Sequence, residues 1–137
     1  MASIGTTGMQ GINDFLRTHA TSLALRASRN DILASNIANA ATPNFKARDL
    51  DFKAEFERQE GIKGNLATTD SRHLTAIQPT GISRLQYRVP VNPSLDGNTV
   101  ELPVEQMQFS ENVLRYQTSL SLINLKISGL TSAIKGE

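Results

Sequence analysis

A long proline-free stretch near the carboxyl end constrains the fold of this 137-residue chain more than any other feature. Between residues 104 and 134, apolar residues recur at alternating steps of four and three, the spacing of a left-handed coiled-coil seam. Pro103 suits a first helical turn and Gly136 suits a helix end, so a helix is expected over 103–137. The predicted seam residues are Phe109, Val113, Tyr116, Leu120, Ile123, Ile127, Leu130 and Ile134.

The surface of this predicted helix is unusually poor in charge. Lys126 is its only charged residue between Tyr116 and Ile134, and leucines also lie outside the seam. A helix of this length spans about 45 Å, whereas a compact chain of this size is roughly 37 Å across. We therefore expect other molecules to cover part of the helix. A buried helix of an ordinary bundle is the alternative, but so short a chain offers little to surround it.

A second, weaker helical pattern is expected over residues 12–42. Its seam includes Leu23, Leu33 and Ile37, but the polar residues His19, Arg26 and Asn30 interrupt the heptad. Pro43 ends the pattern, because proline disfavours a helical conformation in the residue before it. Residues 1–11 are rich in glycine and poor in apolar residues, so they are expected to be flexible in the free chain.

The end of this second helix carries two asparagines within an uncharged stretch, residues 32–44. Asn36 and Asn39 lie three residues apart, on one helix face, where their amides can bond across a contact with a neighbour. On that hypothesis, Asn36→Ala would spare the hairpin and weaken assembly. The alternative is an ordinary alanine-rich helix end with asparagine near its C-cap.

The middle of the chain, residues 43–102, is predicted to be irregular. Phe52 and Phe56 can dock a short turn on the helices, whereas residues 61–65 and 67–71 have loop compositions. Alternation over residues 85–91 predicts a short or edge strand, and Asp96-Gly97-Asn98 predicts a turn. The expected fold is mainly α, with long N- and C-terminal helices paired as a coiled-coil-like hairpin around an irregular, short-β middle segment.

Composition argues against several classes of protein. The 14 basic and 13 acidic residues nearly balance, which argues against a nucleic-acid partner, and the absence of cysteine excludes disulfides and thiolate metal sites. No run of about 18 apolar residues suggests a membrane span, and the first residues do not resemble a cleavable signal peptide.

The sequence predicts no catalytic, cofactor-binding or metal-binding residues, and no small-molecule substrate. The histidines are isolated, and the one carboxylate cluster lies among basic residues without a surrounding apolar pattern. The residues considered and set aside are His19, His73, Asp49, Asp51, Glu55 and Glu57.

The segment ASNIANAATPNFKA, residues 34–47, resembles the N-terminal signature of the bacterial flagellar basal-body rod protein family. The resemblance continues through RDLDF at 48–52, DGNTVE at 96–101, EQMQFSEN at 105–112 and LRYQ at 114–117. This chain has Asn44 where that family commonly has glycine, and asparagine is the next-best residue for a left-handed conformation. The assembly signature that the resemblance implies comprises Ser35, Asn36, Asn39, Thr42, Pro43, Asn44 and Phe45.

The resemblance implies a non-catalytic structural subunit whose terminal helices pair and stack into the wall of the proximal rod, the drive shaft for motility. It also implies that the chain passes through the flagellar type III export apparatus without signal-peptide cleavage and polymerises in the periplasm. The implied partners are further copies of the chain, other rod subunits, and the MS-ring with its rod adaptor.

Two other functions remain open on the sequence alone. A cytoplasmic coiled-coil binding module or export chaperone could present one amphipathic helix to a partner, and cell fractionation would separate it from a rod subunit. A rod-associated peptidoglycan hydrolase is the third possibility, and cleavage of cell wall that depends on a single carboxylate would support it.

Overall fold

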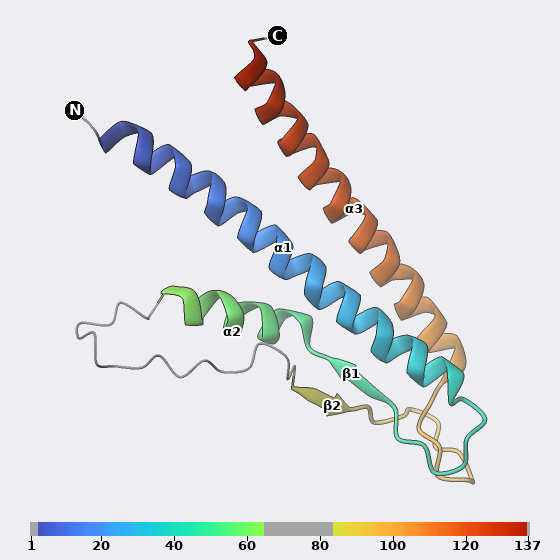
Figure 1. The fold of residues 1–137 in the computed structure, drawn as a ribbon. Coiled ribbons are helices and arrows are strands. Elements are labelled where there is room, and N and C mark those ends of the chain that lie inside the picture. Colours follow the sequence, from blue (N-terminus) through green and yellow to red (C-terminus); the bar gives the residue numbers. More distant parts are fainter. Residues whose placement is uncertain (1–2, 65–83, 137) are drawn as a thin grey trace.

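Two long helices form a hairpin, and a small α/β segment is folded against its closed end. The computed structural model describes residues 3–64 and 84–136. Its elements in chain order are α1 (Ser3–Ala38), β1 (Arg48–Leu50), α2 (Phe52–Gly64), β2 (Leu85–Tyr87) and α3 (Leu102–Lys135). Both ends of the chain lie at the open end of the hairpin (Figure 1). The prediction of a mainly α fold with paired terminal helices and a short-β middle is confirmed.

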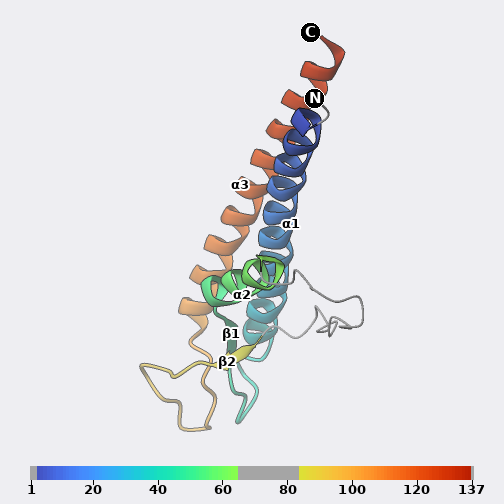
Figure 2. The ribbon, with the colours of Figure 1, turned by 90° about the vertical axis from the view of Figure 1, so that its left-hand side faces the viewer.

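Helix α1 is the central element. It contacts α3 along the hairpin, and it also contacts α2 and β1. Figure 2 shows α2 crossing α1 near the closed end. The axes of α1 and α3 converge where α1 ends and α3 begins, and they separate toward the chain termini (Figure 1). The contacts with α2 and β1 therefore lie toward the closed end, while the first turns of α1 and the last turns of α3 extend beyond them.

Both ends of α3 follow from its sequence. Proline occupies one of its first two positions, where a missing N–H costs no hydrogen bond, and Glu105 in the first turn complements the helix dipole. Lys135 in the last turn complements the negative, C-terminal end of the helix dipole. Gly136 closes the helix in a left-handed conformation, with φ of 72°, and its N–H donates to the carbonyl of Ser132.

The two strands form a minimal antiparallel sheet. Arg48 pairs with Tyr87, Asp49 with Gln86 and Leu50 with Leu85. Leu50 at the end of β1 is buried, Asp49 is half-buried and Arg48 at the start of the strand is exposed. The predicted strand at 85–91 therefore exists, but only over Leu85–Tyr87, and its partner strand was not predicted.

The bounds of α1 and α2 differ from those predicted from the sequence. α1 begins at Ser3, within the segment expected to be flexible, and ends at Ala38. α2 extends through Gly64 and includes Gly61, where a loop was predicted, and that prediction is wrong for residues 61–64. The Phe52 and Phe56 rings stack 5.8 Å apart within α2, so the predicted short turn is a helix. The predicted loop at 67–71 and His73 lie outside the described residues.

The buried interior is small and strongly polar. Within the described residues, the fully buried apolar side chains are Leu25, Leu33, Ala47 and Leu50. The buried polar or charged side chains are Asn36, Glu55, Asn98, Glu105 and Asn112. Amide and carboxylate groups therefore contribute as much to the interior as apolar groups do. Among the described helices, none is long and apolar enough to cross a membrane.

Candidate assembly interface

The turn after α1 forms around the predicted signature residues. The Asn39 N–H donates to the carbonyls of Ser35 and Asn36, at 3.1 and 3.2 Å, and the Asn39 amide donates to the Ser35 carbonyl at 2.8 Å. The Thr42 hydroxyl donates to Asn39 Oδ1 at 3.2 Å. Asn44 has φ of 60°, which confirms that asparagine keeps the left-handed turn expected there.

A distant turn holds this signature turn in place. The side-chain amide of Asn98 donates to the carbonyls of Asn39, Ala40 and Thr42, all within 3.0 Å. Asn98 is 4% exposed, so it is a buried hydrogen-bond donor to three carbonyls of the turn that follows α1. The turn at 96–98 was predicted from its composition, but the role of Asn98 as a cap for another helix was not.

Gly97→Ala is expected to lower the free energy of unfolding by about 1–2 kcal/mol. Gly97 has φ of 76°, a conformation that a Cβ disfavours, and that Cβ would lie 2.5 Å from Asn44 Oδ1. Chemical denaturation monitored by circular dichroism would measure the loss. Gly61→Ala is the matched control, since a Cβ there meets nothing within 4 Å and alanine favours the helix. Equal stability of Gly97→Ala and the wild type would show that the backbone conformation and the close contact with Asn44 do not require glycine at position 97.

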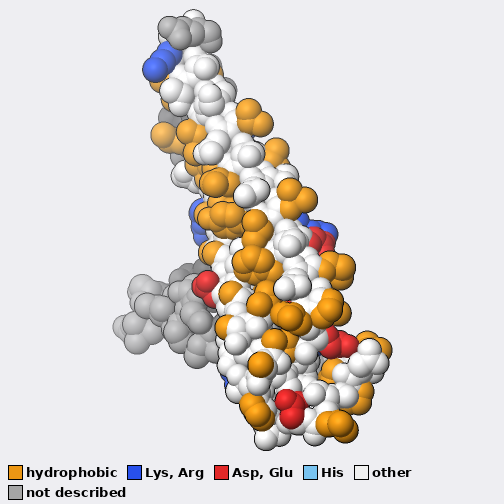
Figure 3. Space-filling model, turned by 90° about the vertical axis from the view of Figure 1, so that its right-hand side faces the viewer, with side chains coloured by type: hydrophobic (Ala, Val, Ile, Leu, Met, Phe, Trp, Pro, Cys, Tyr) orange, Lys and Arg blue, Asp and Glu red, His pale blue; other side chains and the backbone are white. Residues whose placement is uncertain are grey.

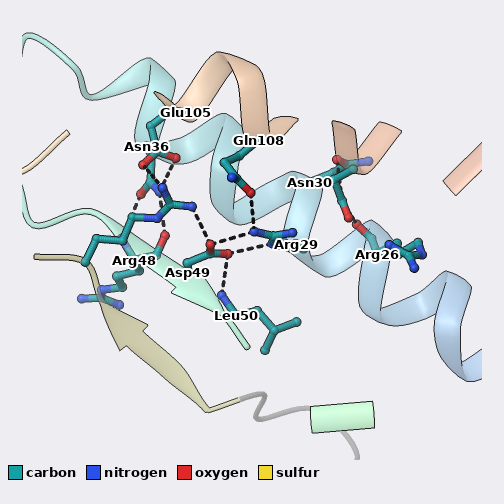
Figure 4. A network of polar contacts seen from close by, with 11 residues as sticks. Arg26, Arg29, Asn30, Asn36, Arg48, Asp49, Leu50, Glu105 and Gln108 are labelled. Atoms are coloured by element: carbon teal, nitrogen blue, oxygen red, sulfur yellow. Dashed lines mark hydrogen bonds and ion pairs between the residues drawn. The ribbon is translucent and has the colours of Figure 1, made fainter. Parts of the chain in front are cut away.

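Asn36 and Glu105 form a buried polar joint between α1, β1 and α3 (Figure 4). The Asn36 amide donates to the Arg48 carbonyl at 2.6 Å and to the Glu105 carboxylate at 3.1 Å, and Asn36 Oδ1 accepts the Arg48 N–H. The Arg88 guanidinium lies 3.3 Å from the Glu105 carboxylate. Asn36 and Glu105 are each 1% exposed, so their partners replace water completely. Asn36 thus has partners for its donor and its acceptor inside the subunit.

Asp49 on β1 extends this joint toward α1. Arg29 donates to both carboxylate oxygens of Asp49, each at 2.9 Å, and also to Gln108 of α3, while Arg88 pairs with Asp49 from beside the sheet. Burial alone would raise the pKa of Asp49, but hydrogen bonds and charge from Arg29, together with the Leu50 N–H and Arg88, hold that pKa below its usual value. The ionised carboxylate is therefore the form that links the elements.

Acid is expected to weaken the fold through Asp49. Because its pKa is lower in the folded state, its contribution is complete above the unfolded pKa of about 3.9 and disappears as the pH falls through the folded pKa. Asp49→Asn should be less stable than the wild type at neutral pH and should lose less stability between about pH 5 and pH 2. Denaturant unfolding at each pH measures both. Parallel pH profiles would contradict this role for Asp49.

A second buried amide joins the helices further along the hairpin. Asn112 is fully buried, and its amide donates to the Arg26 carbonyl and to Asn30 Oδ1, each at 2.8 Å. Its Oδ1 and Arg26 Nε have no partner within the described residues, and the Arg26 guanidinium lies over the Phe52 ring. Arg26 and Asn30, which interrupt the predicted seam, therefore face a polar residue of α3.

The predicted seam residues are only partly enclosed by the hairpin. Leu33 is fully buried, and Leu23 and Ile37 are half-buried, as are five of the α3 residues. Three others on α3 are exposed: Leu120 at 40%, Ile127 at 46% and Ile134 at 86%. The deepest residues of α3 are instead Glu105 and Asn112, because polar groups of α1, together with Arg88 for Glu105, oppose them. The half-buried seam residues of α3 are Phe109, Val113, Tyr116, Ile123 and Leu130.

Four signature residues also line an open groove of about 660 Å³ between α1 and the sheet. Apolar atoms come from Ile32, Phe45, Leu85 and Tyr87, and charged groups come from both helix and strand. We call this depression the signature groove. Its lining residues are Asp31, Ile32, Ser35, Asn36, Asn44, Phe45, Lys46, Arg48, Leu85 and Tyr87.

The outward face of α3 carries apolar side chains with few charges. Figure 3 shows them scattered along the length of the hairpin, and Met107, Leu114, Leu122 and Leu125 are each at least half exposed. Single exposed leucines are common on monomers, but a row of them on a helix with little charge is typical of a contact surface. The non-helical residues Val89, Val91 and Leu95 add further exposed apolar groups near the closed end.

The carboxylates considered for catalysis serve structural contacts. Glu55 is 4% exposed and pairs with Arg58 and Gln59, whose hydrogen bonds lower its pKa against the effect of burial. The His19 ring lies 4.3 Å from that of Phe15. Across residues 3–64 and 84–136, no cluster of three or more potential metal ligands occurs.

Comparison with known proteins places the chain in a family. A family model described as flagella basal body rod protein matches residues 16–46, which include the end of α1 and the signature turn. The chain is 60% identical over 129 residues to the flagellar basal body rod protein FlgB of Cereibacter sphaeroides, covering 94% of this chain and all of that protein. It is 47% identical to FlgB of Aeromonas hydrophila, covering 87% and 91% of the two chains.

A third relative extends the comparison to a more distant species. The chain is 43% identical over 129 residues to FlgB of Escherichia coli strain K12, covering 88% of this chain and 92% of that protein. Similarity at this level spans both long helices and the segment between them. The chain belongs to the FlgB family of flagellar basal body rod proteins.

Proposed function

We propose that this chain is a structural subunit of the bacterial flagellar basal body, which polymerises with other rod subunits into the proximal rod. Membership of the FlgB family is the observation that carries the proposal. The fold supports it, because a hairpin with exposed apolar groups on α3 has surfaces that neighbouring subunits can bury. Transmission of torque through a shaft requires such contacts and no chemical step, so the proposed subunit is not an enzyme.

We also propose neighbours and a location for the subunit. At the base of the rod, the subunit would meet the MS-ring and its adaptor, and elsewhere it would meet copies of itself and of other rod subunits. It would reach the periplasm through the flagellar type III export apparatus without loss of a signal peptide. A small interior supports passage as an unfolded chain, because only four apolar side chains are fully buried among the described residues.

The seam and the signature residues are proposed as the two assembly elements. Ile123 lies half-buried on α3, next to exposed Leu120 and Ile127, where a neighbouring subunit can complete its burial. Ser35, Asn44 and Phe45 face the signature groove, and Thr42 and Pro43 shape the turn beside it. In dilute solution, without neighbours, we expect the ends of the long helices to be partly unfolded, so far-UV circular dichroism should depend on concentration.

Ile123→Asp is expected to abolish motility and to remove the chain from isolated basal bodies. The change places a charge in a surface that assembly buries, which costs several kcal/mol unless the charge is paired. Swimming in soft agar and immunoblots of purified basal bodies measure the two effects. Asn124→Asp adds the same charge at the next, exposed position and is the control.

Wild-type chain that remains in the cytosol while basal bodies lack it would contradict the proposed function. Cleavage of the chain's first residues during export would contradict only the proposed export route, and mass spectrometry of the chain from basal bodies would detect it.

A further inference from the structure

The signature groove combines an apolar floor with a positively charged rim. Arg48 and Lys46 supply two cations and Asp31 one anion, so the net charge of the lining is positive. Lys46 donates to the Gly97 carbonyl, and Arg48 lies over the Tyr87 ring at 5.4 Å. Within the described residues, Arg48 has no carboxylate partner. A fitting occupant would present apolar side chains on either side of an acidic group.

The exposed side of α3 presents that pattern. Met107 and Leu114 are 60% and 64% exposed, and Glu111 lies between them at the helical spacing of i, i+4, i+7. The two apolar side chains are about 10 Å apart along the helix axis. The Glu111 carboxylate pairs with Arg115 at 2.6 Å, but its side chain remains 46% exposed. We call Met107, Glu111 and Leu114 the α3 ridge.

The groove and the ridge lie on different sides of the subunit. Met107 and Leu114 each follow a buried residue, Glu105 or Asn112, by two positions, which is roughly 200° around the helix. Met107 and Leu114 therefore face away from α1, while Glu111 lies at the edge of that face. The groove is formed by α1 with the sheet, and the sheet and α3 lie on different sides of α1 (Figure 1). Neither surface can fill the other within one molecule.

We propose that the α3 ridge of one copy seats in the signature groove of a second copy. Met107 and Leu114 would cover Ile32, Phe45 and Leu85, and Glu111 would pair with Arg48. Because the two surfaces differ and lie on separate sides, the contact is head-to-tail and leaves a free groove and a free ridge at the ends of any pair, so it can extend. This inference rests on the proposed function and identifies which faces of the subunit meet.

Cysteine cross-linking tests the contact directly, because the natural chain has no cysteine. Ser35→Cys and Leu114→Cys place one thiol at the groove and one on the ridge, both at exposed positions. The full-length double variant would be expressed in a strain that lacks the wild-type chain, and the basal bodies isolated from that strain would be oxidised. Covalent dimers and higher multimers are expected on a non-reducing gel, and reducing agent should remove them.

The matched control moves the first thiol off the groove. Ala24→Cys with Leu114→Cys also places two thiols on α1 and α3, but Ala24 does not line the groove. We expect at least about tenfold less covalent dimer from this pair. Equal yields from the two pairs, or no dimer from Ser35→Cys with Leu114→Cys, would overturn the proposed contact.

Charge exchange tests the ion pair at the centre of the contact. Arg48→Glu alone and Glu111→Arg alone should each reduce the amount of chain in basal bodies, because like charges would then meet. The double exchange should restore the amount of chain in basal bodies. Such a recovery would not be expected if the single variants had failed only because they did not fold. Circular dichroism of each purified variant checks the fold. Failure of the double exchange, with all three variants folded, would contradict the pairing of Arg48 with Glu111.

The outcomes separate this inference from the proposed function. If the chain is present in basal bodies but its groove and ridge never cross-link, the contact proposed here is wrong and the rod assignment stands. If the chain is absent from basal bodies, the proposed function fails.

Discussion

Glu105→Ala is expected to lower the free energy of unfolding by about 2–4 kcal/mol and to loosen the closed end of the hairpin. Its carboxylate is 1% exposed and faces both the Arg88 guanidinium and the Asn36 amide. Removing it leaves a cavity and takes one anion away from Arg88, which then relies on Asp49 alone. Urea unfolding monitored by far-UV circular dichroism, at a concentration where helicity no longer depends on dilution, measures the change.

Two further variants test whether the effect of Glu105→Ala depends on the buried position of the carboxylate and on its charge. Glu111→Ala removes a carboxylate from the same helix, but its pair with Arg115 is largely exposed, so less than about 1 kcal/mol is expected. Glu105→Gln keeps an oxygen acceptor for Asn36 and loses the negative charge, so its stability should lie between those of the wild type and Glu105→Ala. If Glu105→Ala lowered the free energy of unfolding no more than Glu111→Ala does, Glu105 would not hold the polar joint together.

Asn36→Ala is expected to destabilise the subunit itself by about 2–3 kcal/mol. The change leaves the N–H and C=O of Arg48 without their side-chain partner and removes one donor from the buried Glu105. This differs from the effect that the sequence suggested, in which the hairpin is spared and only assembly is weakened. Denaturant unfolding of the purified chain decides between the two effects.

Asn39→Ala is the matched control for this variant. Asn39 lies three residues further along, and its side chain makes only exposed local hydrogen bonds among the described residues, to the Ser35 carbonyl and from the Thr42 hydroxyl. A change below about 1 kcal/mol is expected for it. A stable Asn36→Ala subunit that fails to enter basal bodies would show that Asn36 serves a neighbour after all.

The sequence predicted the fold well where the periodicity was strong. The apolar spacing between Phe109 and Ile134, with Pro103 and Gly136 at its ends, located α3 almost to the residue. The spacing and the end signals of α3 depend on local sequence alone, which a single chain displays completely. The left-handed turn at Asn44 was instead predicted from the family resemblance, since asparagine is the next-best residue after glycine for that conformation.

The parts that sequence reasoning missed depend on contacts between distant segments. Asn98 caps carbonyls more than fifty residues away, and Asn112 bonds to Arg26 and Asn30 of the opposite helix. No local pattern distinguishes such an asparagine from one in a solvated turn. The pairing of β1 with β2 joins residues 48–50 to 85–87, and a three-residue strand has too short a pattern to detect.

The predicted seam on α3 shows the same difference between local sequence patterns and contacts with distant segments. Heptad spacing predicted an apolar seam on α3, but it could not reveal that Glu105 and Asn112 lie deeper than the apolar residues of that seam. A buried carboxylate is uncommon unless it is paired, and the partners of Glu105 come from α1 and from the segment after β2. The assembly role of the signature residues stays a prediction, and four of them line one groove.

The modest apolar interior has a thermodynamic consequence for the isolated subunit. Heat capacity and denaturant sensitivity both grow with the nonpolar area that unfolding exposes, and here four fully buried apolar side chains share the interior with five polar ones. Calorimetry of the dilute chain should therefore record a broad, low-enthalpy melting transition. Incorporation into the rod should sharpen that transition and shift it upward, as neighbouring copies dehydrate the leucines that a single copy leaves in water.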